Sequence, residues 1–207
     1  MTSTLKVRNI EMGEGAASDS KILFDGNAQD FHIGLDDSAD SLTIGLGSTL
    51  GTTSHMVFDA NGHITKPLQP AFSVTNTGSS QSFNASTLTT ITYDSERFDV
   101  NGDFSSNTFT APVTGKYQLS INIPISALDN GATFYYSEIA TSNRRYLQMF
   151  DMNFSGDLDY KGFGLSLLVD MDANDTAQAK IYQHGGSNQS SVNNDAEFNH
   201  FTGFLVC

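Results

Sequence analysis

The sequence is short of two kinds of residue on which many binding and catalytic proteins depend. It has a single cysteine, Cys207, so no disulfide can form within the chain, and a CxxC metal or redox site is excluded. Only 10 lysines and arginines stand against 23 aspartates and glutamates, which gives a formal net charge of -13. Binding by phosphate neutralisation needs clustered basic residues, so we expect neither nucleic acid nor an anionic lipid surface as a partner.

Long apolar runs are also absent. The longest apolar stretch, Gly162 to Val169, is far shorter than the roughly 18 residues of a membrane span, so we expect no membrane insertion. The first residues, MTSTLKVRNIEMGEG, contain no apolar segment of the secretory type, and we expect a protein that is not exported by the usual route. The 15 phenylalanines and 7 tyrosines nevertheless supply the large apolar groups that a packed core requires.

Residues 1–68 carry apolar residues in short alternating bursts separated by Asp, Asn, Gly and Ser. The bursts are Ile22-Leu23-Phe24, then Phe31, Ile33 and Leu35, then Leu42, Ile44 and Leu46, then Met56 and Phe58, then Ile64. This period of two predicts short strands joined by turns, and Asn61-Gly62 has the composition of a tight hairpin turn.

Each burst offers only two or three inward side chains, too few for such a small sheet to be stable alone. We therefore expect residues 1–68 to form a β stalk that gains its core by wrapping identical chains around one axis. The alternative is a monomeric meander docked on the rest of the chain. Residues 1–18, rich in Ser, Glu and Gly, are expected to be a flexible or partner-ordered tail.

Two prolines, Pro67 and Pro70, mark an extended connector, and we place a domain boundary after Leu68. Residues 69–207 again read as all-β, with apolar and aromatic runs separated by turn clusters and no sustained helical period. Eight to ten short strands at this spacing indicate a sandwich, a barrel or a jelly roll.

One stretch of the second domain resembles the signature of the globular heads of the complement first-component q subunit, in the tumour-necrosis-factor-like superfamily. The stretch begins with the aromatic residues Phe98 and Phe104, and its residues at the family spacing are Phe109, Pro112, Gly115 and Tyr117. The closing segment, Phe201 to Val206, resembles the last strand of that family and contains Gly203 and Phe204. Leu119 stands where the family usually has Phe.

The resemblance implies a jelly-roll β-sandwich over about residues 69–207 that forms tight trimers. Within it, Phe109 and Tyr117 are expected to fill the core, Gly115 to turn the chain, Pro112 to end a strand, and the segment with Gly203 and Phe204 to lie in the core. These residues specify a fold and carry no chemistry. Short β repeats leading through a Pro-rich connector to such a head also resemble marine bacteriophage fibre and appendage proteins.

No catalytic motif is present, and we expect a protein that is not an enzyme. The sequence lacks a Gly-x-Ser-x-Gly elbow, a Gly-rich phosphate loop and a His-Glu-x-x-His pair, and its paired carboxylates lie in turn-like segments. The run from Asp170 to Asp175 begins like a calcium loop but lacks Gly at the sixth position and Glu at the twelfth. We expect no cofactor, with a looser Ca²⁺ site from turn oxygens as the alternative.

Two segments are candidate ligand-binding elements. Arg144, Arg145 and Tyr146 contain the only basic doublet of the second domain, which suits a carboxylate or an acidic sugar, although an ordinary strand end is the simpler interpretation. The long polar loop 185–194, with Asn188, Gln189 and Asn193, has the flexible composition of a recognition loop. The pair Tyr135-Tyr136 reads either as alternating core and surface or as a platform for glycan stacking.

The sequence therefore predicts a structural virion protein of a bacteriophage, assembled in the host cytoplasm: a homotrimeric fibre or appendage tip. Its residues 1–68 would attach to other virion proteins, and its head would contact a host glycan or protein. A capsid decoration or head-fibre protein is the first alternative, and a free carbohydrate-binding module is the second.

Overall fold

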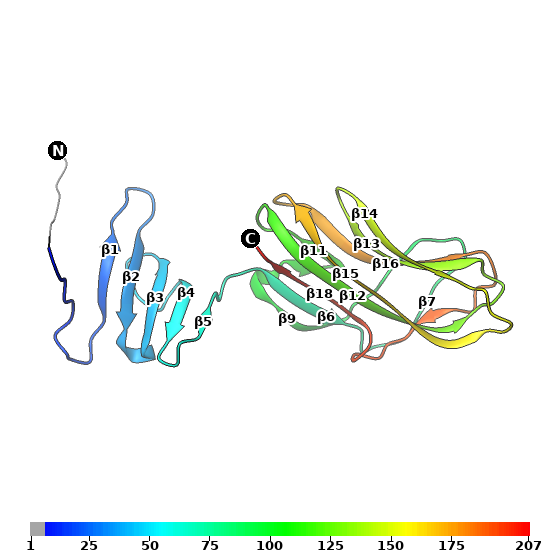
Figure 1. Cartoon of the computed structure of the whole chain (residues 1–207), viewed down its shortest axis with the longest axis horizontal. Helices are drawn as coiled ribbons and strands as arrows, with labels where there is room; N and C mark the ends of the chain where they lie inside the picture. The colour runs from blue at the N-terminus through cyan, green and yellow to red at the C-terminus, as the bar shows by residue number, and fades with distance from the viewer. Residues whose placement is uncertain (1–6) are drawn as a thin grey trace. The chain divides into compact units, whose positions relative to one another are not determined.

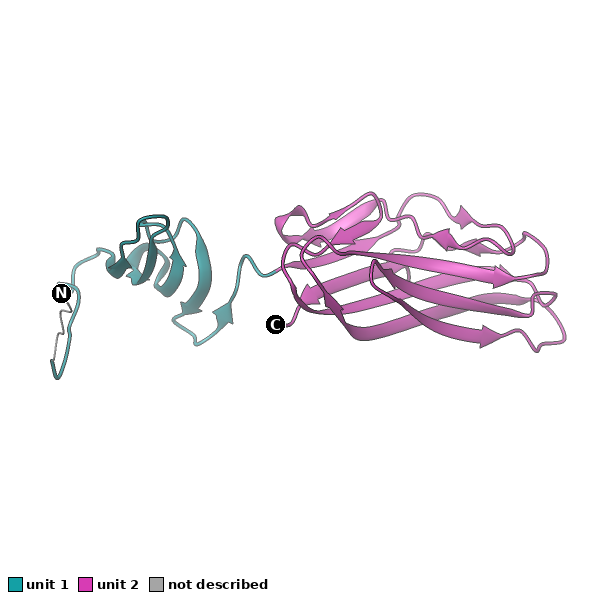
Figure 2. Ribbon diagram, turned by 90° about the horizontal axis from the view of Figure 1, so that it is seen from above, with its two compact units in different colours: residues 1–69 teal, residues 70–207 magenta. Residues whose placement is uncertain are grey.

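A computed structural model describes residues 7–207 of the chain. They belong to two compact units, an N-terminal unit within residues 1–69 and a C-terminal unit of residues 70–207, which Figure 2 distinguishes by colour. Of the tail expected over residues 1–18, residues 1–6 lie outside the described part, and residues 7–18 form no helix or strand. No helix among the described residues is long and apolar enough to cross a membrane.

The N-terminal unit is one antiparallel meander in which each strand pairs with the next (Figure 1). Its strands, in order, are β1 (Ser20–Phe24), β2 (Phe31–Asp36), β3 (Ser41–Leu46), β4 (Ser54–Asp59) and β5 (Ile64–Thr65), with the one-turn 3-10 helix η1 (Asp37–Ala39) after β2. The Asn61-Gly62 turn joins β4 to β5, and the positive φ of 87° at Gly62 explains why glycine stands there. The apolar bursts of the sequence fall on these five strands.

The two faces of this sheet differ in what covers them. On one face, loop 47–53 folds back over the strands: Leu50 is buried, the buried His32 ring lies 2.9 Å from the Gly47 carbonyl through Nδ1, and the Lys21 ammonium donates to the Ser48 carbonyl. The other face carries the alternating apolar side chains, which within the described residues of the unit are exposed or only partly buried. The sheet therefore has one packed face and one open face.

The C-terminal unit is an all-β sandwich of two sheets (Figure 1). The first sheet contains β10 (Phe104–Ser105), β11 (Thr108–Thr110), β16 (Thr176–His184), β13 (Phe134–Thr141) and β14 (Arg145–Asp151), with β8 (Thr89–Thr90) paired to β16. The second contains β7 (Gln81–Ser82), β17 (Ser191–Val192), β12 (Gly115–Leu128), β18 (His200–Leu205), β6 (Ala71–Thr75) and β9 (Ser95–Asp99), with β15 (Leu158–Met171) paired to β12. The 3-10 turn η2 (Val100–Gly102) follows β9. The all-β prediction is confirmed.

Aromatic side chains from both sheets meet in the core of the sandwich. The Phe72 ring stacks on Phe109 at 4.7 Å between centroids and on Phe104 at 5.2 Å, and it meets Phe201 edge-on at 4.9 Å. Tyr117 is fully buried, and its hydroxyl donates to the Val113 carbonyl at 2.7 Å. Burial of this phenol raises its pKa. Aromatic pairs such as those of Phe72 stabilise the fold by about 0.5–1.5 kcal/mol each, in addition to the effect of the apolar area that they bury.

Two of the aromatic residues that resemble the family signature do not lie in the core. Phe98 is 53% exposed on β9 at the edge of the second sheet, and Phe204 is 50% exposed on β18. The expectation that the closing segment buries Phe204 is wrong, because alternation along β18 turns Phe201 and Gly203 inward and Phe204 outward. Phe201 fills the core in its place.

Glycine is required at two positions where strands approach each other closely. A Cβ at Gly203 would lie 2.5 Å from both the Leu119 and Phe72 side chains, and one at Gly115 would lie 2.6 Å from Leu205. Pro112 lies between β11 and β12, outside both strands, where its missing N–H breaks no ladder.

Candidate functional site

Arg144 and loop 185–190 lie at opposite ends of the C-terminal unit. Pro70, Gly115 and Cys207 share one end, which we call the entry end, because the Leu205 amide donates to the Pro70 carbonyl and the Lys116 amide to Cys207. Loops 129–133, 152–157 and 185–190 share the opposite end, which we call the far end. Arg144 lies at the entry end and loop 185–190 at the far end, so the structure does not bring the two candidate segments together.

Arg144 is engaged by a neighbouring carboxylate. Its Nη2 donates to Asp170 Oδ2 at 2.8 Å, and both side chains are about half exposed. Nearby, Asp175 accepts hydrogen bonds from Ser142 Oγ at 2.7 Å and Asn143 Nδ2 at 2.6 Å, which lower its pKa. The acidic residues that resemble a calcium loop thus serve as partners for their own neighbours. Within residues 7–207, no group of three or more His, Cys, Asp or Glu side chains is placed to hold a metal ion.

Arg145 makes a two-point contact with a buried carboxylate. Its Nε lies 2.7 Å from Glu138 Oε1 and its Nη2 lies 2.5 Å from Glu138 Oε2, while the Glu138 side chain is only 1% exposed. The same Nη2 donates to the Tyr136 hydroxyl at 3.0 Å, and the guanidinium lies 5.8 Å from the centroid of the Tyr136 ring. These hydrogen bonds, those from Glu138 first, raise the pKa of Arg145 above its usual value. The guanidinium is therefore fixed in position, and about half of the Arg145 side chain is open to solvent.

Tyr146 does not share this surface. Along β14 successive side chains point to opposite faces, so Arg145 faces outward while Tyr146 packs against the core. The sequence predicts that Arg145 and Tyr146 contact one ligand together, but the two side chains lie on opposite faces of the strand. Tyr135 and Tyr136 are divided in the same way: Tyr135 is fully buried, and Tyr136 lies on the outer face.

Arg145 borders an aromatic patch made of Phe134, Tyr136, Tyr182 and His184. Tyr136 lies opposite Tyr182 in the register of β13 and β16, with ring centroids 4.9 Å apart, and Phe134 lies opposite His184 at 4.6 Å. Phe134 and Tyr136 stack along the strand at 6.4 Å. The patch therefore forms a ladder of cross-strand pairs on the outer face of the first sheet, starting next to the far-end loop.

Loop 185–190 is tied down by hydrogen bonds, whereas its composition predicts a flexible loop. The buried Asp129 carboxylate accepts from the Ser187 amide, from Ser187 Oγ at 2.8 Å and from the Gly131 amide at 2.7 Å, and these bonds, that of the Ser187 amide first, lower its pKa. Asn188 accepts from the Ala85 amide at 2.7 Å, and Gln189 donates to Asp157 at 3.0 Å. Polar residues that suggest mobility in the sequence here hold the loop in one shape.

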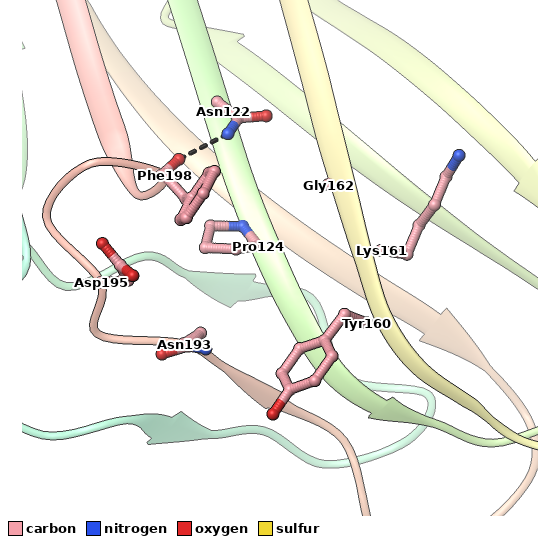
Figure 3. A pocket seen from close by; sticks show the side chains of 8 residues that line it. All are labelled: Asn122, Pro124, Tyr160, Lys161, Gly162, Asn193, Asp195 and Phe198. Carbon is pink, nitrogen blue, oxygen red and sulfur yellow. Dashed lines mark hydrogen bonds between the residues drawn. The ribbon is translucent and has the colours of Figure 1, made fainter.

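Asn193 lines a cavity of about 450 Å³ on the second sheet (Figure 3), whereas the strands of the aromatic patch belong to the first sheet. Pro124, Tyr160 and Phe198 supply its apolar lining, and Asn122 donates to the Phe198 carbonyl at 2.5 Å. In Figure 3, Pro124 lies between the Phe198 and Tyr160 rings. The polar candidates Asn188, Gln189 and Asn193 are thus divided between the far end and this cavity.

Arg145 and Tyr136 were candidates from the sequence alone, whereas Phe134, Tyr182, His184 and Glu138 were not. A usable signal was present: Phe134, Tyr136 and Glu138 recur at every second position, as do Tyr182 and His184, which assigns each set to one face of a strand. What the sequence lacks is the register that sets β13 against β16.

No family model matches the sequence, and no curated protein matches it either. Among solved structures, the globular domain of the zebrafish complement 1qA protein matches with a TM-score of 0.48 and 18% identity, over 67% of this chain and 98% of that one. Two structures of murine APRIL match with TM-scores of 0.49 and 0.47 and 8% and 9% identity, over 67% of this chain and 99% of each. These neighbours are tumour-necrosis-factor-like jelly rolls, and the sandwich assignment rests on the sheets described above.

Proposed function

We propose that this chain is a non-enzymatic structural protein of a bacteriophage particle: a homotrimeric fibre or appendage tip whose head contacts a glycan on the host surface. The proposed contact rests on the aromatic patch and on Arg145, which Glu138 holds in position. The N-terminal unit would attach to other virion proteins. The assignment to a virion rests on the resemblance of the chain's organisation to phage appendage proteins.

The aromatic patch has the chemistry that a sugar requires. A sugar ring offers apolar C–H groups on its faces and hydroxyls at its rim, and tyrosine side chains present a rigid apolar ring with a polar tip. The Tyr182 hydroxyl lies 3.3 Å from His184 Nδ1, so the polar tips are held in place. Arg145 uses Nε and Nη2 for its protein partners, which leaves Nη1 to donate to a ligand oxygen.

The charge at the patch favours a hydroxyl-rich ligand over a strongly acidic one. Glu138 neutralises Arg145 within the same two-point contact, so the patch carries no unpaired positive charge from this pair. The chain as a whole has a net charge of -13, which repels polyanions. Weak contacts of this kind gain strength when several copies act together, as three heads on one appendage would.

The outer face of the second sheet supports association of three heads. Ser120 and Ser166 lie side by side on it, Gly162 and Gly164 leave it flat, and Phe204 and Leu168 are half exposed there. Small side chains with a few exposed apolar groups suit close approach of a second copy. Light scattering of the full chain should give about 67 kDa, three times the chain mass of 22.3 kDa. A stable monomer would overturn the trimer.

Labelling of intact particles tests the virion assignment. Antibody against residues 70–207, viewed by electron microscopy, should mark the tail end of the particles. Label spread over the capsid would replace the appendage assignment with a capsid decoration protein. The absence of label from all particles would overturn the virion assignment itself.

Binding to an array of purified bacterial surface polysaccharides tests the contact. We expect Tyr182→Ala to weaken binding by at least about tenfold, since stacking on one aromatic ring contributes on the order of 1 kcal/mol per copy and three copies act together. Val113→Ala, an exposed apolar truncation at the entry end, is the matched control and should leave binding unchanged. Equal binding by both variants would show that the aromatic patch does not contact the glycan.

A further inference from the structure

The open face of the N-terminal sheet is a continuous apolar surface. We call it the apolar face; its eleven side chains are Ile22, Phe24, Phe31, Ile33, Leu35, Leu42, Ile44, Leu46, Met56, Phe58 and Ile64. Strand register places them on one side: Ile22 lies opposite Ile33, which lies opposite Ile44, which lies opposite Met56. None of the eleven is charged.

The exposure of these side chains is unusual for a surface that faces solvent. Ile22, Phe24, Phe31 and Ile64 are between 42% and 58% exposed, and loop 47–53 covers the opposite face of the same sheet. Four strands of five or six residues and the two-residue β5, about 4.8 Å apart and with about 3.3 Å per residue, present a face on the order of 400 Å². An uncovered apolar patch of that size marks an interaction site.

We infer that the apolar face is an interface among three copies of this chain, whose N-terminal sheets form the sides of a closed prism with the eleven side chains inside. The inference deepens the homotrimer of the proposed function and rests on it. A face with no charged side chain offers nothing to a charged partner, and it is complementary to itself.

The width of the sheet fits three sides. The four spacings between five strands make each side about 19 Å wide, so the centre of each side would lie about 5.5 Å from a threefold axis. Sheets packed face to face lie about 10 Å apart, so side chains from each sheet fill about 5 Å. A three-sided prism is therefore filled, while a four-sided one, at about 9.6 Å from its axis, would be hollow.

The edges of the sheet also favour a closed ring of copies. The sheet has different edges, β1 on one side and the two-residue β5 on the other. In a ring, the β1 edge of each copy meets the β5 edge of the next, which is a heterologous contact that closes and leaves no edge strand open.

Three-armed maleimide cross-linking of the full chain tests the inference. In a Cys207→Ser background, Leu46→Cys places a thiol at the end of the middle strand, where three copies would meet at the open end of the prism and the reagent can reach it. Leu23→Cys, on the opposite face of β1 and 40% exposed, is the matched control. We expect a covalent trimer from Leu46→Cys and at least tenfold less from Leu23→Cys.

Two further measurements keep the test decisive. Ile33→Glu should raise the concentration at which the trimer dissociates by at least tenfold, because three carboxylates would face one apolar core, and Leu23→Glu should change it less than twofold. Circular dichroism should show that all variants keep their strand content.

The outcomes separate this interface from the proposed trimer. A wild-type mass of about 67 kDa without cross-linking at Leu46→Cys overturns the apolar face as an interface and leaves the trimer to the C-terminal unit. A covalent dimer as the largest product overturns the threefold arrangement. A wild-type monomer overturns both the interface and the trimer of the proposed function.

Discussion

The two units of this chain use the same period of two along their strands, yet only the C-terminal unit encloses its apolar side chains. There, two sheets face each other across rings such as Phe72, Phe109 and Phe201. The N-terminal unit has one sheet, and its apolar face has no second sheet within the unit to pack against. An alternating pattern thus predicts strands and their inward side, whereas the number of layers decides whether that side is covered by the same chain.

Truncating one phenylalanine in each unit should show the difference in enclosure most clearly. Phe109→Ala removes a fully buried ring and should cost about 3–5 kcal/mol in the free energy of unfolding of the C-terminal unit. Phe24→Ala removes a ring that is 53% exposed and should cost the isolated chain less than about 1 kcal/mol. Urea unfolding at low protein concentration measures both. Similar losses for the two variants would contradict the difference in enclosure.

Loss of the contact between Arg145 and Glu138 should have the next largest effect on stability. Arg145→Ala leaves the Glu138 carboxylate buried without its charged partner and should destabilise the C-terminal unit by about 3 kcal/mol. Arg144→Ala, which removes a half-exposed partner of Asp170, is the matched control and should cost less than about 1 kcal/mol. Thermal unfolding monitored by near-ultraviolet circular dichroism distinguishes them. Equal shifts would mean that burial of Glu138 contributes little.

Gly203→Ala probes how tightly the sandwich is closed. The added methyl group would lie 2.5 Å from both Leu119 and Phe72, so we expect a loss of about 1–3 kcal/mol from overpacking. Gly164→Ala is the control, since its Cβ would lie no closer than 3.6 Å to a neighbour. A neutral Gly203→Ala would show that the two sheets separate more easily than their packing indicates.

Acid should loosen the far-end loop through Asp129. The pKa of this carboxyl is lowered in the folded chain, so its stabilising effect is complete above its unfolded value of about 4 and is lost as the pH falls through the folded value. Asp129→Asn should therefore be less stable than the wild type at pH 7, by about 1–2 kcal/mol, and the two should converge toward pH 2. Thermal unfolding across this range measures the convergence, and a constant difference would contradict it.

The fold was largely accessible from the sequence, and the candidate site only partly. Strands and turns follow from local patterns such as the burst Phe31, Ile33 and Leu35 or the Asn61-Gly62 turn, because a period of two and a positive φ are properties of neighbouring residues. The two-sheet sandwich was likewise predicted.

The aromatic patch depends on register between strands that are far apart in the sequence. Tyr136 and Tyr182 are 46 positions apart, and no local pattern sets one against the other. A different reason explains why Tyr146 was paired with Arg145 and why Phe204 was placed in the core. Both assignments followed adjacency or family resemblance, while the side of the strand decided the outcome.

The chain enters and leaves the C-terminal unit at one place, since the Leu205 amide donates to the Pro70 carbonyl at 3.0 Å. This arrangement makes the unit an exchangeable module: it can be transplanted as a cassette into a loop of another protein without stretching either junction. A label or tag fused after Cys207 would lie at the entry end and leave the far-end loop and the aromatic patch unobstructed. Variation at the far end is therefore free to proceed without altering the junction with the rest of the chain.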